Sequence, residues 1–122
     1  TEVVINGGAI TAANAGEGTA IYHPQNGLLT VNGGTVSAPT GIEMRSGTLT
    51  VNAGAIKSTA STFDEKGNGS GTTMTGVAVA VSQHVTDKDL KVVINGGTLT
   101  GPYALYEKDL QNLYLDSSVV RL

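Results

Sequence analysis

A short phrase that recurs along the chain constrains its fold more than any other feature. Each copy has a run of alternating apolar and polar residues, then an Asn-Gly-Gly or Asn-Ala-Gly bend, then a second apolar run. Such repeats must be recognised first, because each unit then packs against its neighbours instead of forming a separate core. The copies are residues 2–11, 28–37, 48–57 and 91–100, with a more divergent copy at 112–121.

The phrase itself predicts a strand, a bend and a second strand. Leu29 and Val31 point to one side of the first strand and Thr30 to the other, as in a half-buried strand. The bend follows at 32–34, where Asn and Gly tolerate unusual backbone angles. A third apolar segment follows each bend unit, so one repeat is expected to hold three short strands. These third segments are 19–22, 40–43, 75–78 and 103–106.

The spacing between repeats decides how the strands associate. The bend asparagines are 26 residues apart from Asn6 to Asn32, 20 from Asn32 to Asn52, and 43 from Asn52 to Asn95. Unequal loops with an unchanged strand order favour a coil that returns to its start, with each turn stacked in parallel on the last. Equivalent apolar residues should then form inward columns. The predicted columns are Ile5, Val31, Val51, Ile94 and Leu115; Ile10, Val36, Ile56, Leu99 and Val120; and Ile21, Ile42, Val77 and Leu105.

The motif [LIV]-x-[LIV]-N-G-G-[TA]-[LIV]-[TSK] resembles the right-handed parallel β-helix of the pectate-lyase-like superfamily. It is similar in particular to the Thr/Gly-rich β-helix regions of bacterial surface and carbohydrate-binding proteins. The resemblance implies an all-β solenoid of about four to five coils, each of three short strands. A left-handed hexapeptide helix is disfavoured, because no six-residue period is present. The resemblance also implies a structural ladder of buried side-chain amides, Asn6, Asn32, Asn52 and Asn95, ended by Asp116.

Composition narrows the classes of partner. Charged residues make up 14% of the chain, and the seven Lys and Arg residues are scattered, so nucleic-acid binding is not expected. No apolar run is long enough to suggest membrane insertion. Cysteine is absent, which is compatible with a secreted protein stabilised by repetition. We expect a single domain over 1–122 that belongs to a longer bacterial surface or extracellular protein, with neighbouring coils or domains as partners.

Three insertions interrupt the repeat, and they gather at two corners of the predicted coil. They lie at 12–18, 58–73 and 82–90 and carry much of the charge. The strand between the two corners would form the floor of a groove. Its outward column is predicted to be Tyr22, Glu43, Ala78 and Tyr106.

The groove residues suggest a glycan as ligand. Exposed tyrosines suit sugars, since the ring stacks on a pyranose while the hydroxyl still forms hydrogen bonds. The alternative for these tyrosines is a surface role in filling gaps over the sheet. The predicted ligand-binding residues are Tyr22, Glu43, Tyr103, Tyr106 and Arg45.

Acidic residues in the insertions suggest calcium as the one possible cofactor. The segment 64–70 has oxygen ligands at alternating positions but departs from the EF-hand pattern, because Lys66 occupies a ligand position. Two acidic-Lys-acidic triplets, 87–89 and 107–109, could contribute carboxylates, although their lysines favour mutual neutralisation. The predicted weak metal ligands are Asp64, Asn68, Asp87 and Asp89.

The sequence thus predicts a binding or adhesion module directed at a glycan or another host or cell-surface ligand. A passive stalk or scaffold is the first alternative. A polysaccharide lyase or hydrolase is the second, and it is disfavoured because the predicted floor lacks a basic residue and Glu43 lacks an opposing carboxylate. No catalytic residue is predicted.

Overall fold

The computed structural model describes residues 2–12, 18–68, 71–84, 90–108 and 120–121. Strands and short bends account for these residues, and no helix occurs among them. Within this described part there is accordingly no helix long and apolar enough to cross a membrane. The protein is all-β, and its strands run mainly in parallel sheets.

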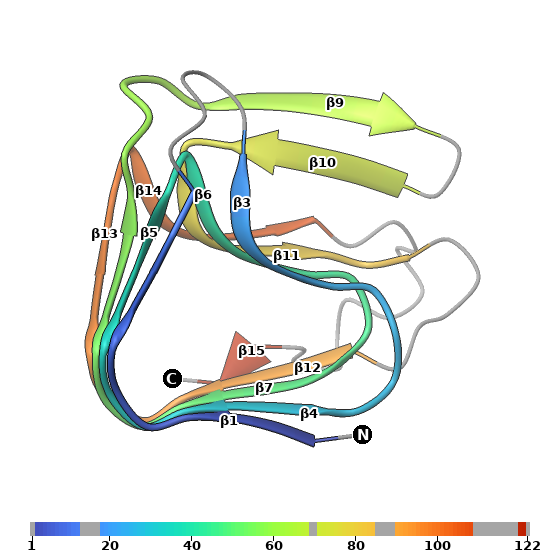
Figure 1. The fold of residues 1–122 in the computed structure, drawn as a ribbon. Coiled ribbons are helices and arrows are strands. Elements are labelled where there is room, and N and C mark those ends of the chain that lie inside the picture. The colour runs from blue at the N-terminus through green and yellow to red at the C-terminus, as the bar shows by residue number, and fades with distance from the viewer. Residues whose placement is uncertain (1, 13–17, 69–70, 85–89, 109–119, 122) are drawn as a thin grey trace.

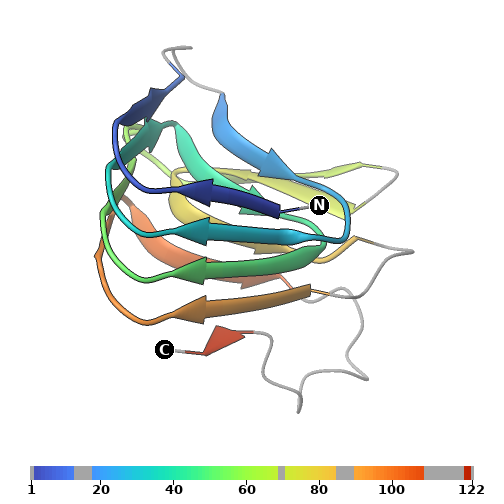
Figure 2. The ribbon, with the colours of Figure 1, turned by 60° about the horizontal axis from the view of Figure 1, so that its bottom comes forward.

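The chain passes through three parallel sheets in the same order, again and again (Figure 1). The first sheet has the order β1 (Glu2–Ile5), β4 (Leu28–Val31), β7 (Gly47–Val51), β12 (Leu90–Ile94) and β15 (Val120–Arg121). The second has the order β2 (Ala9–Thr11), β5 (Thr35–Ala38), β8 (Ala55–Ser58) and β13 (Thr98–Thr100). The third has the order β3 (Thr19–His23), β6 (Thr40–Met44), β11 (Val77–Ser82) and β14 (Tyr103–Lys108). Each strand therefore pairs with its counterpart in the adjacent repeat, as Figure 2 shows for β1, β4, β7 and β12.

Two of the predicted inward columns are confirmed over the first four repeats. In the first sheet Ile5, Val31, Val51 and Ile94 are paired in register. In the second sheet Ile10, Val36, Ile56 and Leu99 are paired in register. The repeat thus fixes both the strands and their alignment, because shifting any strand by one residue would turn its apolar side chains outward.

The third column was predicted with the wrong residue in β11. Val79, not Val77, pairs with Ile42 and Leu105. Val77 lies instead in a separate buried cluster with Met74 and Ala80. The reason is local irregularity: the consecutive residues Ala78 and Val79 both pack in the main core, which interrupts the alternation that the prediction assumed.

The divergent last repeat was also placed in the wrong register. Val120 was predicted for the second column, but it pairs with Val92 in the first sheet. Leu115 and Asp116 lie outside the described residues. The repeat signal was too weak at this point to position the strand.

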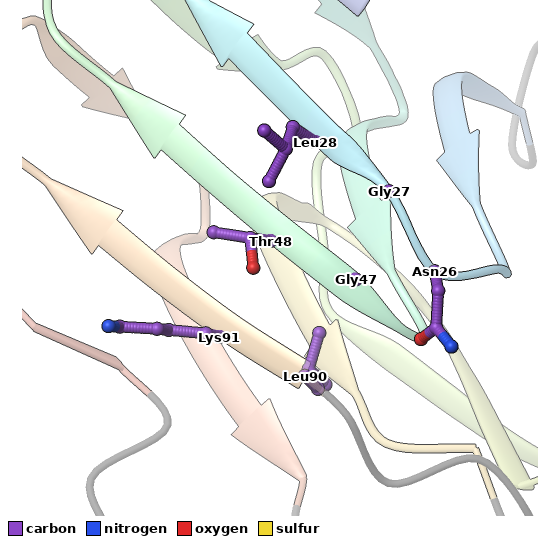
Figure 3. A pocket seen from close by; sticks show the side chains of 7 residues that line it. All are labelled: Asn26, Gly27, Leu28, Gly47, Thr48, Leu90 and Lys91. Carbon is purple, nitrogen blue, oxygen red and sulfur yellow. The ribbon is translucent and has the colours of Figure 1, made fainter. Parts of the chain in front are cut away.

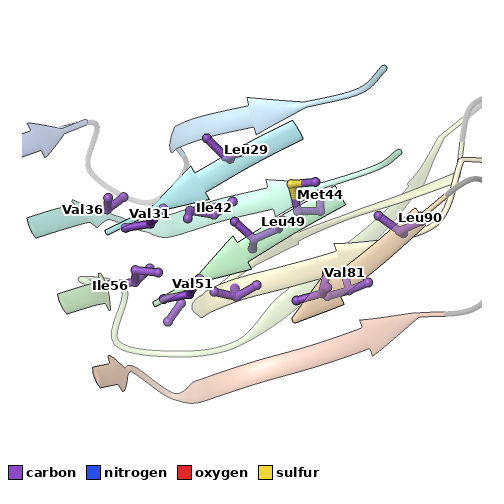
Figure 4. Packing of buried hydrophobic residues seen from close by; sticks show 13 residues of the cluster. Leu29, Val31, Val36, Ile42, Met44, Leu49, Val51, Ile56, Val81 and Leu90 are labelled. Atoms are coloured by element: carbon purple, nitrogen blue, oxygen red, sulfur yellow. The ribbon is translucent and has the colours of Figure 1, made fainter. Parts of the chain in front are cut away.

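Branched aliphatic side chains fill the space between the sheets (Figure 4). The central members of each column are fully covered, whereas Ile5, Ile21 and Leu105 in the outer repeats are only partly buried. β-branched residues suit this narrow interior, because they pack well on pleated sheets. The core is therefore most completely buried in the middle repeats.

A glycine is required at the third position of each bend. Gly34 has φ 85°, and its counterparts in the other copies also have positive φ. A Cβ on Gly34 would lie 2.7 Å from the carbonyl oxygen of Gly8. Both the backbone angle and the neighbouring bend below therefore exclude a side chain here.

The asparagine ladder is present, but on the surface. The Nδ2 atoms of Asn32, Asn52 and Asn95 donate to the Oδ1 atoms of Asn6, Asn32 and Asn52 at 3.0, 2.8 and 2.8 Å. All four side chains are exposed, so the prediction of buried amides was wrong. The bend turns the asparagines away from the core while keeping them stacked.

The insertion at 58–73 folds into a hairpin. β9 (Asp64–Asn68) and β10 (Gly71–Thr75) pair antiparallel and are not part of the three parallel sheets. Figure 1 shows this hairpin extending beside the third sheet. The position of the hairpin therefore limits access of a ligand to the outer face of the third sheet. Of the other two insertions, residues 13–17 and 85–89 lie outside the described part of the chain.

Candidate functional site

The hairpin covers the middle of the surface that was predicted to be an open groove floor. The outward column of the third sheet is Tyr22, Glu43, Ala80 and Tyr106, with Ala80 in the place predicted for Ala78. Glu43 and Arg45 are buried, at 2% and 0% relative exposure. The open groove floor that was expected is thus partly closed, because the insertion packs over it instead of standing beside it, and the role of these two residues in ligand binding stays a prediction.

Polar side chains of the third sheet hold the hairpin by its main chain. Thr40 Oγ1 donates to the carbonyl oxygen of Met74 at 2.6 Å, and the Met74 N–H donates to Glu43 Oε1 at 3.2 Å. Arg45 Nη1 donates to the carbonyl oxygen of Thr72 at 2.9 Å, and Ser82 Oγ donates to the same oxygen. We call Thr40, Glu43, Arg45 and Ser82 the clasp.

The clasp provides hydrogen-bond partners for backbone groups at a buried strand edge. Antiparallel pairing with β9 satisfies the backbone of alternate β10 residues, and the polar groups of Thr72 and Met74 point toward the third sheet. Buried backbone groups without partners cost free energy, so the four side chains replace a ladder of backbone hydrogen bonds. An ion pair between Lys108 and Glu65 at 3.4 Å adds a partly exposed contact between β14 and β9.

Burial dominates the electrostatics of Glu43. Loss of solvation raises the pKa of its carboxyl above the ordinary value, and this outweighs the hydrogen bond from Met74 N and the attraction of Arg45, which both lower it. The folded protein therefore holds a proton on Glu43 more tightly than the unfolded chain does.

This raised pKa predicts a pH-dependent contribution to stability. Between the unfolded and folded pKa values the native state binds more protons, so the free energy of unfolding should fall as pH rises through that window and then level off. Glu43→Gln keeps an acceptor for Met74 N but cannot titrate. In urea unfolding from about pH 4 to about pH 8, stability of the wild type relative to Glu43→Gln should decline as pH rises. Parallel pH profiles for the two proteins would contradict the prediction.

A cleft lies where β3 and β6 meet the hairpin. Its volume is about 230 Å³, and it is lined by Gly18, Thr19, Thr40, Glu43, Lys66, Thr73, Met74 and Thr75. Thr19, Thr73, Thr75 and Lys66 contribute polar groups to the lining, while Thr40 and Glu43 also bond the main chain of Met74. A polar concavity of this kind suits a small polyhydroxylated group better than an apolar one.

Tyr22 lies in register with Glu43 on the neighbouring strand β3. Its side chain is 50% exposed. It therefore presents an accessible aromatic surface on the same face as the cleft. Of the residues predicted to bind ligand, Tyr22 and Glu43 are in register on neighbouring strands, and Glu43 lines the cleft.

The other two predicted tyrosines gather on the opposite side of the hairpin. The rings of Tyr103 and Tyr106 are 5.4 Å apart between centroids, and Phe63 lies 4.9 and 4.8 Å from them, respectively. Tyr103 remains 46% exposed, whereas Tyr106 is partly buried. Phe63 was not among the predicted site residues, although a sole phenylalanine inside an otherwise polar insertion indicates that the insertion packs against another part of the protein.

Of the predicted calcium ligands, Asp64 is the one whose side chain lies in the described part of the structure. Asp64 is exposed at the start of β9, the side chain of Asn68 is not described, and Asp87 and Asp89 lie outside the described residues. Among the residues that are described, no group of three or more His, Cys, Asp or Glu side chains is arranged to hold a metal. Calcium binding stays a prediction.

A second, shallower depression lies on the outer face of the first sheet (Figure 3). Its volume is about 460 Å³. The residues that line it are Asn26, Gly27, Leu28, Gly47, Thr48, Leu90 and Lys91. Leu28 is exposed at this depression, whereas Leu90 belongs to the buried core.

Comparison of the chain with protein-family models, curated proteins and solved structures finds no significant match to any of the three. The candidate site therefore has to be interpreted from its own geometry.

Proposed function

We propose that this chain is a segment of a right-handed parallel β-helix that serves as a glycan-binding module on a bacterial surface or secreted protein. The stacking of equivalent strands in three parallel sheets supports the β-helix, as does the resemblance of the repeated motif. The binding site is the cleft between β3, β6 and the hairpin. The module acts without a catalytic step and without a required cofactor.

One observation carries the binding proposal. The half-exposed ring of Tyr22 lies in register beside Glu43, which lines a polar cleft with four threonines. A pyranose ring has an apolar face and a rim of hydroxyls. The aromatic ring would stack on the former, and the cleft would hydrogen-bond the latter. A cleft of about 230 Å³ has room for one sugar unit, so the ligand would be recognised at a single residue of a longer glycan.

The site can be tested by measuring glycan binding on an array, followed by calorimetry with the strongest ligand. Tyr22→Ala should weaken binding about tenfold or more, which corresponds to ~1.4 kcal/mol. Tyr22→Phe should retain most of the affinity, because it keeps the stacking ring. Tyr103→Ala serves as the matched control, since it removes an equally exposed tyrosine on the other side of the hairpin. Loss of binding in Tyr103→Ala but not in Tyr22→Ala would reject the cleft as the site.

A passive scaffold is the second candidate. The observation that favours it is the closure of the predicted groove, since the clasp commits Glu43 and Arg45 to holding the hairpin. In that case the repeats would only separate other parts of a longer protein. Absence of any glycan binding by the folded wild type would favour this role.

A further inference from the structure

Three bends of identical sequence, Asn-Gly-Gly, lie in different surroundings. They are residues 6–8, 32–34 and 95–97, in the first, second and fourth repeats, whereas the third repeat has Ala53 in place of the first glycine. An asparagine followed by glycine is especially prone to spontaneous deamidation, because glycine has no side chain to hinder ring closure. Since the local sequence is the same in the three bends, any difference in their reactivity within the folded protein must come from the structure.

Deamidation of an Asn-Gly pair uses only groups of the chain and water. The backbone nitrogen of the glycine loses its proton and attacks the side-chain carbon Cγ of the asparagine, and the side-chain nitrogen leaves as ammonia. Water then opens the resulting five-membered succinimide at either carbonyl, which gives aspartate or isoaspartate. The reaction therefore needs an accessible glycine N–H, a side-chain nitrogen that is free to leave, and room for the glycine nitrogen to reach Cγ.

The bend of the first repeat meets all three requirements. Asn6, Gly7 and Gly8 are exposed, and a Cβ on Gly7 would meet nothing within 4 Å. In the ladder Asn6 acts only as an acceptor, since its Oδ1 takes the hydrogen bond from Asn32 Nδ2. Within the part of the chain that the structure describes, neither Asn6 Nδ2 nor the Gly7 N–H donates a hydrogen bond. The preceding strand, β1, is also the outermost strand of the first sheet in the described structure (Figure 2).

Hydrogen bonds restrain the equivalent asparagines of the second and fourth repeats. The Nδ2 atoms of Asn32 and Asn95 both donate within the ladder, at 3.0 and 2.8 Å, so the group that must leave is held. Asn32 Oδ1 also accepts from Asn52 Nδ2 at 2.8 Å. At the fourth repeat the attacking group is held as well, because the Gly96 N–H donates to the carbonyl oxygen of Val51 at 3.3 Å.

The space around the bends differs in the same way. A Cβ on Gly33 would lie 2.7 Å from Asn6 O, and one on Gly96 would lie 2.6 Å from Asn52 O, because each bend rests on the backbone of the bend before it. Both glycines are partly buried, whereas Gly7 is exposed. In the described structure the Gly33 N–H donates to no acceptor, so packing and the ladder are what restrain the second bend.

We propose that Asn6 is a site of spontaneous deamidation in this protein, and that the asparagine ladder protects Asn32 and Asn95 from the same reaction. The direction of the ladder also makes the product acceptable at this position. An aspartate at position 6 still accepts the hydrogen bond from Asn32 Nδ2, and that bond becomes charge-assisted. An aspartate at position 32 would lose the donor and place its own oxygens against Asn6 Oδ1.

Peptide mapping by mass spectrometry measures the rates at all three bends in one sample of the folded chain, incubated at mildly alkaline pH. Asn6 should react at least about tenfold faster than Asn32 and Asn95, because the latter two must first break hydrogen bonds and open the stacked bends. In concentrated urea the three rates should agree to within about twofold, since the ladder is lost and the flanking sequences are nearly the same. The other two Asn-Gly pairs, 26–27 and 68–69, have different residues after the glycine and do not enter the comparison.

Asn52→Ala tests the protection by the ladder. The substitution removes the acceptor of Asn95 Nδ2 and the donor to Asn32 Oδ1. Deamidation at Asn95 should then rise about fivefold or more, while the rate at Asn6 stays unchanged. Gly7→Ala is the complementary control, because its methyl group should slow ring closure at Asn6 and leave the rates at Asn32 and Asn95 as they are.

Two results would overturn the proposal. If Asn32 or Asn95 reacted as fast as Asn6 in the folded wild type, Asn6 would not be a site selected by the structure, and this comparison needs no substitution. If Asn52→Ala, shown to be folded by circular dichroism, left the rate at Asn95 unchanged, the ladder would not be what protects the other bends.

Discussion

Replacing Gly34 with alanine is expected to destabilise the protein by about 3 kcal/mol or more. Two effects combine at this position. The backbone has φ 85°, which costs an L-residue free energy, and the added Cβ would lie 2.7 Å from Gly8 O and 2.9 Å from Gly7 C. Those atoms belong to the backbone of the bend below, so they cannot move aside without disturbing the pairing of β1 and β2 with their neighbours. Chemical denaturation of purified variants measures the loss.

The chain supplies controls that separate the two effects. A Cβ on Gly7 or Gly8 would meet nothing within 4 Å, but only Gly8 has positive φ, at 86°. Gly33 has no such φ, but its Cβ would lie 2.7 Å from Asn6 O. Gly7→Ala should change stability by less than about 0.5 kcal/mol, and Gly8→Ala should cost ~1–2 kcal/mol for the backbone angle alone. Gly33→Ala should lose stability through the steric clash alone. If Gly34→Ala lost no more stability than Gly8→Ala, the close stacking of the bends would not be what requires glycine at position 34.

The second large effect is expected from Ile42→Ala in the centre of the third sheet. Ile42 is completely buried in the main core, so truncation removes apolar burial and leaves a cavity. Losses of about 2–5 kcal/mol are usual for such a change. Because the flanking columns come from strands fixed by their own pairing, the cavity should collapse little and the cost should lie in the upper part of that range.

Ile21→Ala is the matched control. It removes the same side chain from the same column, one repeat toward the N-terminus, where Ile21 is only partly buried. Its cost should be clearly smaller, about half that of Ile42→Ala, since fewer contacts are lost. If denaturant unfolding showed equal losses of stability for the two variants, the expected dependence of the loss on burial would be contradicted.

The repeated sequence motif made most of the strand alignment in the three parallel sheets predictable. Ile5, Val31, Val51 and Ile94 could be aligned from the sequence, because the bend asparagine beside each one marks its position. The third segment has no such marker, which is why Val77 was chosen in place of Val79. Where a strand departs from strict alternation, as at Ala78, periodicity alone cannot locate the inward residue.

The candidate site was less predictable, since it depends on an insertion outside the repeat. Tyr22 and Glu43 could be placed on the same outward column from the pattern alone. The burial of Glu43 and Arg45 could not, because nothing in their own repeat indicates that residues 64–75 return to cover them. Long-range packing of this kind leaves only faint traces in a local pattern, here the single phenylalanine at Phe63.

The clasp has a consequence for how the surface of this protein can change. Thr40, Arg45 and Ser82 bind main-chain carbonyl oxygens of the hairpin, and Glu43 binds a main-chain N–H, so none of these contacts depends on the identity of a hairpin side chain. The exposed positions of β9 and β10 can therefore accept many sequences while the hairpin stays attached at the same place. Because the hairpin is held by its backbone, foreign peptide segments grafted at these exposed positions should be displayed without loss of the underlying fold.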